Sequence, residues 1–146
     1  MFLGQFYHNI DDKGRLTVPV RYREDLVPDG AYVMQGFERN LVVLPSERYI
    51  ELSQRVNQMS MTDSTARLLR RLVFSTANRV ELDKTGRILL PQFLREFAGL
   101  VSGTVIVGMG SYFEIWTPDS WNVQNDELMD AQSNLDRFSA LNLSFT

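Results

Sequence analysis

Residues 11–19 read Asp-Asp-Lys-Gly-Arg-Leu-Thr-Val-Pro, and residues 83–91 read Asp-Lys-Thr-Gly-Arg-Ile-Leu-Leu-Pro. The two phrases lie 72 positions apart. Each places an aspartate four residues before an arginine, a glycine directly before that arginine, and a closing proline. A repeat of this length is typical of one supersecondary unit that has been duplicated. The sequence therefore predicts a single structural unit used twice.

The repeat extends beyond the two phrases. Arg23-Glu24 matches Arg95-Glu96 in register, and two strand-like apolar runs follow in each copy. A half of roughly 45 residues is too small to bury a sufficient core alone, so we expect the halves to share one core. The expected organisation is a first unit over residues 5–47, connecting helices over residues 48–76, a second unit over residues 77–120, and a C-terminal helix and tail over residues 121–146.

Each phrase is expected to form the turn of a β-hairpin. An aspartate that opens such a turn can accept backbone N–H bonds and can pair with the arginine four residues later. Gly14 and Gly86 supply the positive φ that these turns need. We therefore predict that Asp11 and Asp83, with the two glycines, organise the loops. Alternation in the strands that follow predicts four buried side chains: Leu16, Val18, Ile88 and Leu90.

Two interpretations of these loops remain open, namely a purely structural turn or a contact with nucleic acid. In the second, Arg15 and Arg87 lead their strands from the hairpin tips, with Lys13 and Lys84 beside them. Basic side chains on a rigid hairpin can contact phosphates or enter the major groove, where arginine reads guanine. The interpretations are compatible, because the aspartate would fix the pose of the arginine.

Longer helices are expected outside the two phrases. Ser46 is the predicted N-cap of a helix over residues 47–58, and Asp63 or Ser64 that of a helix over residues 65–74. A third helix is expected over residues 118–132, with Thr117 as its N-cap. From residue 133 the sequence becomes rich in Asn and Ser and predicts a mobile tail or a packing arm.

Charge is distributed unevenly along the chain. The net charge is −3, but residues 48–95 carry nine basic and four acidic side chains, whereas residues 96–146 carry one basic and seven acidic. Part of the basic excess is the cluster of Arg67, Arg70 and Arg71 on one predicted helix face. We interpret this cluster as a solvated face in preference to a phosphate contact.

Composition excludes several classes of site. There are no cysteines, and His8 is the single histidine, so neither a thiolate nor a histidine-rich metal site is expected, and no cofactor is predicted. The chain shows no apolar run that would span a membrane and no basic leader at its N-terminus, so we expect a cytoplasmic protein. The duplicated aspartates invite comparison with aspartic proteases, but each would be held ionised by an arginine, whereas that dyad shares a proton. We therefore predict that the chain is not an enzyme and has no small-molecule substrate.

Residues 2–24, the Arg-Leu-Leu-Arg-Arg-Leu run from Arg67, and residues 83–91 resemble the MraZ family of bacterial transcriptional regulators. The resemblance covers about residues 1–120 and includes both Asp-x-x-x-Arg motifs. It implies an α+β fold, mainly β with short helices: two tandem AbrB-like units that form a double-split β-barrel-like body with a pseudo-two-fold axis. The second motif has Lys84-Thr85 where the first has Asp12-Lys13, so equal roles for the two loops do not follow.

The resemblance also implies a function. It leads us to expect a ring-shaped homo-oligomer that associates with the nucleoid and binds double-stranded DNA sequence-specifically upstream of the division and cell-wall gene cluster. A head-to-tail ring repeats its loops with one polarity, so we expect it to prefer direct DNA repeats. The alternative is an antitoxin-type module that binds DNA and a partner protein. Such modules carry one unit and dimerise, whereas this chain carries two fused units.

Overall fold

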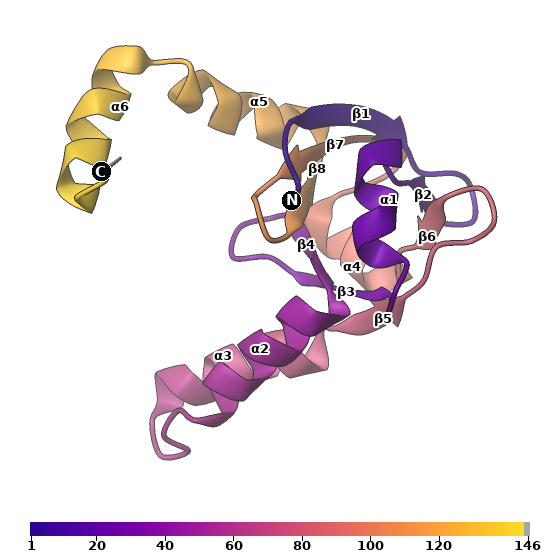
Figure 1. Cartoon of the computed structure of the whole chain (residues 1–146), viewed down its shortest axis with the longest axis horizontal. Coiled ribbons are helices and arrows are strands. Elements are labelled where there is room, and N and C mark those ends of the chain that lie inside the picture. The colour runs from indigo at the N-terminus through magenta and orange to yellow at the C-terminus, as the bar shows by residue number, and fades with distance from the viewer. Residues whose placement is uncertain (145–146) are drawn as a thin grey trace.

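The computed structural model describes residues 1–144 and shows an α+β fold with two helical arms that diverge from a β-rich body (Figure 1). Each unit contributes four strands and a short helix to the body. The elements of the first unit are β1 (Gln5–Asn9), β2 (Arg15–Thr17), α1 (Val20–Leu26), β3 (Ala31–Gln35) and β4 (Leu41–Pro45). Those of the second are β5 (Asn78–Val80), β6 (Arg87–Leu89), α4 (Gln92–Ala98), β7 (Gly103–Gly108) and β8 (Phe113–Trp116).

Six strands form one antiparallel sheet in the order β1-β7-β8-β4-β3-β5. The counterparts in the two units are β1 and β5, β3 and β7, and β4 and β8. Replacing each strand by its counterpart and reading the order from the other end gives the same order, so a pseudo-two-fold axis passes between β4 and β8. The first strand of each unit pairs with the other unit, because β1 pairs with β7 and β5 pairs with β3. The predicted fold class is confirmed, with one correction: the sheet is open, with β1 and β5 at its edges, and does not close into a barrel.

The remaining strands, β2 and β6, form a separate two-stranded antiparallel ribbon. The pairs are Arg15 with Leu89, Leu16 with Ile88 and Thr17 with Arg87. The predicted hairpin turns are formed, since the Asp11 N–H donates to the Arg15 carbonyl and the Asp83 N–H to the Arg87 carbonyl, both at 2.9 Å, but the expected pairing of β1 with β2 and of β5 with β6 is wrong. A single bridge joins Ile10 to Leu16, after which β1 and β2 belong to different sheets. The ribbon is favoured because the pairing of β2 with its counterpart β6 places both central side chains, Leu16 and Ile88, in the core.

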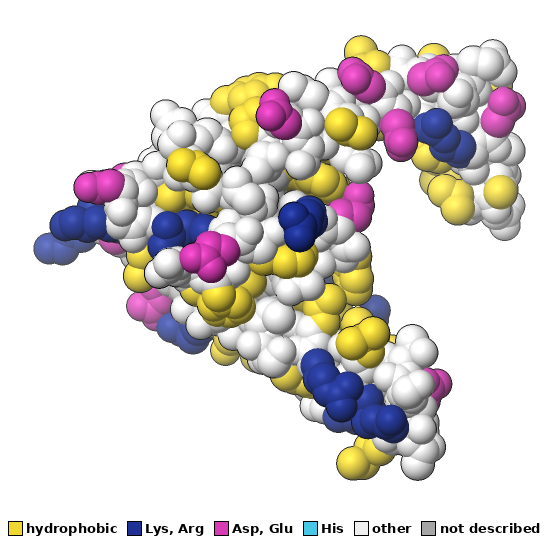
Figure 2. Space-filling model, turned by 180° about the vertical axis from the view of Figure 1, so that it is seen from behind, with side chains coloured by type: hydrophobic (Ala, Val, Ile, Leu, Met, Phe, Trp, Pro, Cys, Tyr) yellow, Lys and Arg dark blue, Asp and Glu magenta, His cyan; other side chains and the backbone are white. Residues whose placement is uncertain are grey.

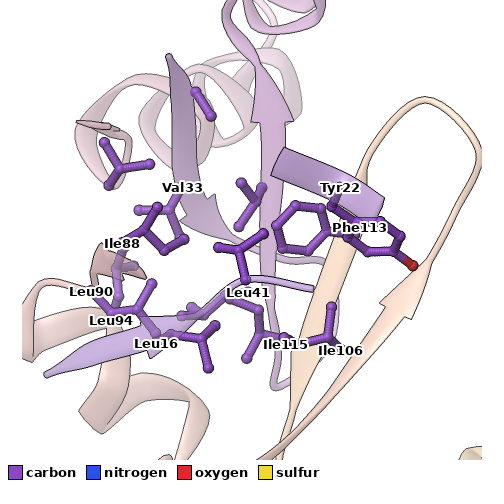
Figure 3. Close-up of a cluster of buried hydrophobic side chains, with 14 of the residues drawn as sticks. Leu16, Tyr22, Val33, Leu41, Ile88, Leu90, Leu94, Ile106, Phe113 and Ile115 are labelled. Carbon is purple, nitrogen blue, oxygen red and sulfur yellow. The ribbon is translucent and has the colours of Figure 1, made fainter. Parts of the chain in front are cut away.

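The ribbon and one face of the large sheet enclose the main hydrophobic core (Figure 3). The prediction that Leu16, Val18, Ile88 and Leu90 are buried is confirmed, since none exposes more than 1% of its surface. Full burial of one such side chain contributes about 1.5–3 kcal/mol. The residues in this core come from both units, so neither unit has a complete core of its own.

Two helical arms extend from the body. The first contains α2 (Ser46–Asn57) and α3 (Ser64–Ser75), and the second contains α5 (Pro118–Leu128) and α6 (Ala131–Phe138), followed by a 3₁₀ turn, Ser139–Leu141. Asp63 caps α3 and Thr117 caps α5, as predicted. The prediction for Ser46 is wrong, because α2 begins after Pro45 and the Ser46 hydroxyl instead donates to the Asp29 carbonyl at 2.7 Å.

The C-terminal segment differs from the prediction of one helix followed by a tail. The α5 helix ends at Leu128, and Asp130 starts α6 by accepting hydrogen bonds from the backbone N–H and the hydroxyl of Ser133. The polar residues that indicated a tail thus cap a second helix. Residues 145–146 of the predicted tail lie outside the described residues. Within the described part of the chain, no helix has the length and apolar character needed to cross a membrane.

Candidate nucleic-acid interface

The loop between β1 and β2 is held by Asp11. Its Oδ1 accepts the backbone N–H groups of Lys13 at 3.0 Å and Arg15 at 2.9 Å, and its Oδ2 accepts the Arg15 Nε–H at 2.7 Å. The carboxylate therefore closes the turn and sets the orientation of the arginine side chain at the same time. Gly14 sits at the tip with φ +85°, which a residue with a Cβ adopts only with strain.

The loop between β5 and β6 repeats this geometry around Asp83. Its Oδ1 accepts the N–H groups of Thr85 and Arg87, both at 2.9 Å, and its Oδ2 accepts the Arg87 Nε–H at 3.0 Å. The Thr85 hydroxyl adds a further bond to the carboxylate at 3.0 Å. The two loops thus share one mechanism for orienting an arginine.

One contact joins the two loops and breaks their symmetry. Arg87 Nη1 donates to Asp11 Oδ2 at 3.2 Å, so Asp11 binds both arginines. Arg15 makes no matching contact with Asp83 in the residues that the structure describes. The terminal guanidinium nitrogens of Arg15 are consequently freer than those of Arg87 to bind an external acceptor.

Two arginines from the short helices support the tips of the loops from beneath. Arg23 Nε–H donates to the Val18 carbonyl at 2.9 Å and Arg95 Nε–H to the Leu90 carbonyl at 3.0 Å. Each guanidinium packs against the loop glycine of the opposite unit, so that a Cβ at either glycine would overlap it. The sequence-based prediction assigned no role to Arg23 or Arg95. Their matching positions in the two copies of the repeat are the signal that could have indicated a shared role.

The loop carboxylates are strongly acidic. Hydrogen bonding from the Arg87 backbone N–H, aided by Thr85 and the Arg87 charge, lowers the pKa of Asp83 to about 2. The Arg15 backbone N–H, with further contributions from its guanidinium and from Lys13, lowers the pKa of Asp11. Both loops therefore carry ionised aspartates at neutral pH.

The outward face of the ribbon is basic and lies at the end of the molecule away from both arms (Figure 2). It presents Arg15, Thr17, Arg87 and Leu89, with the two arginine side chains 32% and 28% exposed. Lys13 and Lys84 flank it and are exposed. Neither lysine has an ion-pair partner within residues 1–144. The predicted basic residues thus share one surface, formed by the ribbon and the two loops.

The other basic cluster does not belong to this surface. Arg70 binds the Asn57 side chain and the Asn57 and Met59 carbonyls, and Arg67 binds the Met61 carbonyl at 2.9 Å. These contacts hold the turn between α2 and α3. No three His, Asp or Glu side chains of residues 1–144 are grouped so that they could hold a metal ion.

Comparison with known proteins places the chain in a family. The family model described as "MraZ protein, putative antitoxin-like" matches residues 1–72 and again residues 73–141. The chain belongs to the MraZ family. The relatives include proteins named "Transcriptional regulator MraZ" from Thermomicrobium roseum, 45% identical over 128 residues, and from Herpetosiphon aurantiacus, 41% identical over 130 residues. A third, from Desulforamulus reducens, is 45% identical over 125 residues.

These MraZ relatives match along most of their length. The alignments cover 88%, 89% and 86% of this chain and 89%, 90% and 87% of the respective relative. The names describe regulators and not enzymes, which agrees with the sequence-based prediction. The two matches of the family model correspond to the two tandem MraZ units, and their boundary falls near the end of α3.

Proposed function

We propose that this chain is a DNA-binding transcriptional regulator that contacts double-stranded DNA through the β2–β6 ribbon and its two loops. The names of the MraZ relatives support the regulatory role. The observation that carries the site is the pair of arginines, Arg15 and Arg87, that carboxylates hold in fixed poses on an outward ribbon face. The major groove admits a two-stranded ribbon, and an oriented guanidinium matches the guanine O6 and N7 acceptors.

The remaining predicted residues have distinct roles in this proposal. Lys13 and Lys84, at the two ends of the face, contact backbone phosphates, which position the protein without reading sequence. Asp11 and Asp83 stay on the protein side and hold the arginines. The chain carries net charge −3, so binding depends on the local basic surface, and its affinity falls with salt.

Two finer features belong to the proposal. The first is assembly into a head-to-tail homo-oligomer, closed as a ring, that presents several ribbons with one polarity. The second is the target, which we propose to be direct repeats upstream of the division and cell-wall gene cluster, including the protein's own gene, with association with the nucleoid. Several ribbons on one DNA raise the overall affinity through effective concentration.

The test compares binding to this upstream DNA by wild type and by Arg15→Ala and Arg87→Ala proteins. Each substitution is expected to cost about 1–3 kcal/mol per base contact and to relax specificity at one position. Arg39→Ala is the matched control, because Arg39 is an exposed arginine in the loop between β3 and β4. Wild-type binding by both variants, in their normal oligomeric state, would show that the loops are only structural turns.

The antitoxin-type module remains the second candidate, because the matching family model is itself described as antitoxin-like. In that case the protein would bind DNA together with a partner protein. The two fused units favour the regulator, since one chain already supplies a complete ribbon. A dimeric mass in solution and a toxin gene beside this one would favour the antitoxin.

A further inference from the structure

The outward face of the ribbon carries one apolar side chain among polar ones. Of its four side chains, Arg15, Thr17 and Arg87 are polar, whereas Leu89 is apolar and 58% exposed. Its neighbour in β6, Ile88, is buried in the core, so Leu89 points to the opposite side of the ribbon and adds nothing to that core. The face that we propose to contact DNA therefore exposes a leucine that the fold does not use for packing.

Leu89 lies directly beside Arg15, because the two residues are paired across the ribbon. The next pair along is hydrogen-bonded, since the Leu90 N–H donates to the Gly14 carbonyl at 2.9 Å. Antiparallel pairs alternate, so Arg15 and Leu89 form a non-hydrogen-bonded pair, whose Cα atoms lie about 4.5 Å apart with the side chains close together. Base pairs are stacked about 3.4 Å apart, so these two side chains can reach the same base pair or neighbouring ones.

The two ends of the ribbon present different chemistry. The repeat offset of 72 residues places Arg87 in register with Arg15 and Leu89 in register with Thr17. One end therefore pairs Arg15 with Leu89, and the other pairs Arg87 with Thr17. Arg87 is also held at 3.2 Å by Asp11 of the other loop. A ribbon with two equal ends would read a palindrome, whereas this ribbon is suited to a sequence that has a direction.

The major groove offers a partner for each side chain at the Arg15 end. A guanidinium matches the O6 and N7 acceptors of guanine, and the C5-methyl group of thymine is the apolar feature of this groove. Contact between Leu89 and that methyl group is favourable because it removes both from water. A cytosine or adenine in the same place presents an amino group, which a leucine would desolvate without giving it a hydrogen-bond acceptor.

We propose that Leu89 determines specificity by contacting the C5-methyl group of a thymine within about two base pairs of the guanine that Arg15 reads. This inference rests on the ribbon as the DNA site given under the proposed function, and it names the base chemistry that the ribbon selects. It also gives each ribbon a fixed direction on the DNA, which suits the direct repeats proposed as the target.

The test removes single methyl groups from the DNA. In the upstream DNA that wild type binds, each thymine is replaced in turn by deoxyuridine, at the equivalent place in every repeat, and the affinities of wild type and Leu89→Ala are measured. Uracil keeps the base pairing of thymine and lacks only the methyl group. At one position it should weaken wild-type binding roughly fourfold for each ribbon, the effect of exposing one methyl group, and leave the binding of Leu89→Ala unchanged.

A second base analogue locates the guanine. Deazaguanine with carbon in place of N7 lacks one major-groove acceptor. At one guanine near that thymine, it should weaken binding by wild type and by Leu89→Ala but leave binding by Arg15→Ala unchanged. Leu3→Ala is the matched control, because Leu3 is 63% exposed and precedes β1, outside the ribbon. This control should respond to every uracil as wild type does.

The inference is wrong if Leu89→Ala responds to every uracil as wild type does. A uniform loss of affinity in that variant would then show that Leu89 only packs against the Arg15 side chain. Because Leu89 is exposed, its truncation should leave the fold intact, so the comparison is between folded proteins. Failure of the proposed function has a different result, namely wild-type binding by Arg15→Ala and Arg87→Ala.

Discussion

At the scale of single residues, Gly86 links the backbone of one unit to a side chain of the other. Its φ is +80°, and an added Cβ would overlap the Arg23 guanidinium. Gly86→Ala should therefore destabilise the protein in two ways. A residue with a Cβ adopts the left-handed conformation at a cost of roughly 1–2 kcal/mol, and the new methyl group would displace the Arg23 side chain. Gly110→Ala is the matched control, since Gly110 has φ +82° and no atom would lie within 4 Å of its Cβ. Urea unfolding should give the larger loss for Gly86→Ala; equal losses would mean that the Arg23 contact contributes nothing.

The ionised state of Asp83 gives a second prediction at this scale. Its pKa is about 2 in the folded protein and 3.8 without the loop contacts, so the unfolded chain binds protons first as pH falls. Its contribution is complete above about pH 5 and is lost as pH falls through 3.8 toward 2. The difference in unfolding free energy between wild type and Asp83→Asn should be constant from neutral pH to about pH 5 and shrink below pH 4. A difference that persists unchanged to pH 2 would contradict this assignment.

At the scale of elements, the sequence predicts which segments are strands but not which strands pair. Alternation placed Leu16 and Ile88 on the inner face, as observed. The alternation of apolar and polar residues does not indicate which strands pair. Because strands adjacent in sequence most often form hairpins, β1 and β2 were expected to pair. Contacts between the two units decide the observed pairing. Pairing β2 with β6 buries both side chains, and the Val18 and Leu90 N–H groups donate to carbonyls of the opposite loops at 2.9 Å.

Helix ends show the same division between local and tertiary causes. The caps at Asp63 and Thr117 depend on neighbouring backbone groups, so the sequence was sufficient to predict them. Ser46 fits the same pattern but binds a carbonyl 17 residues earlier, which is a contact made by folding. The Asp-x-x-x-Arg loops are local and were predictable as turns, whereas the Arg87–Asp11 contact between loops was not. Contact of these loops with DNA stays a prediction.

At the scale of the whole molecule, the exchange of β1 and β5 between units makes the two halves one cooperative structure. Each half lacks a strand that the other supplies, and Leu16 of one half is paired directly with Ile88 of the other. Any substitution in this shared core acts on both halves. The duplication in the sequence therefore does not produce two independently stable domains.

The direct pairing of Leu16 with Ile88 leads to a prediction about cooperativity. Both side chains are at most 1% exposed, so Leu16→Ala and Ile88→Ala should each cost about 2–5 kcal/mol, through lost burial and the cavity left behind. Denaturant unfolding should show one transition in each protein, with a lower midpoint. The loss of unfolding free energy in the double variant should differ from the sum of the two single losses by roughly 0.5–3 kcal/mol, because the two cavities adjoin. Two separate transitions would mean that the units fold independently, and strict additivity would mean that the ribbon does not couple these two side chains.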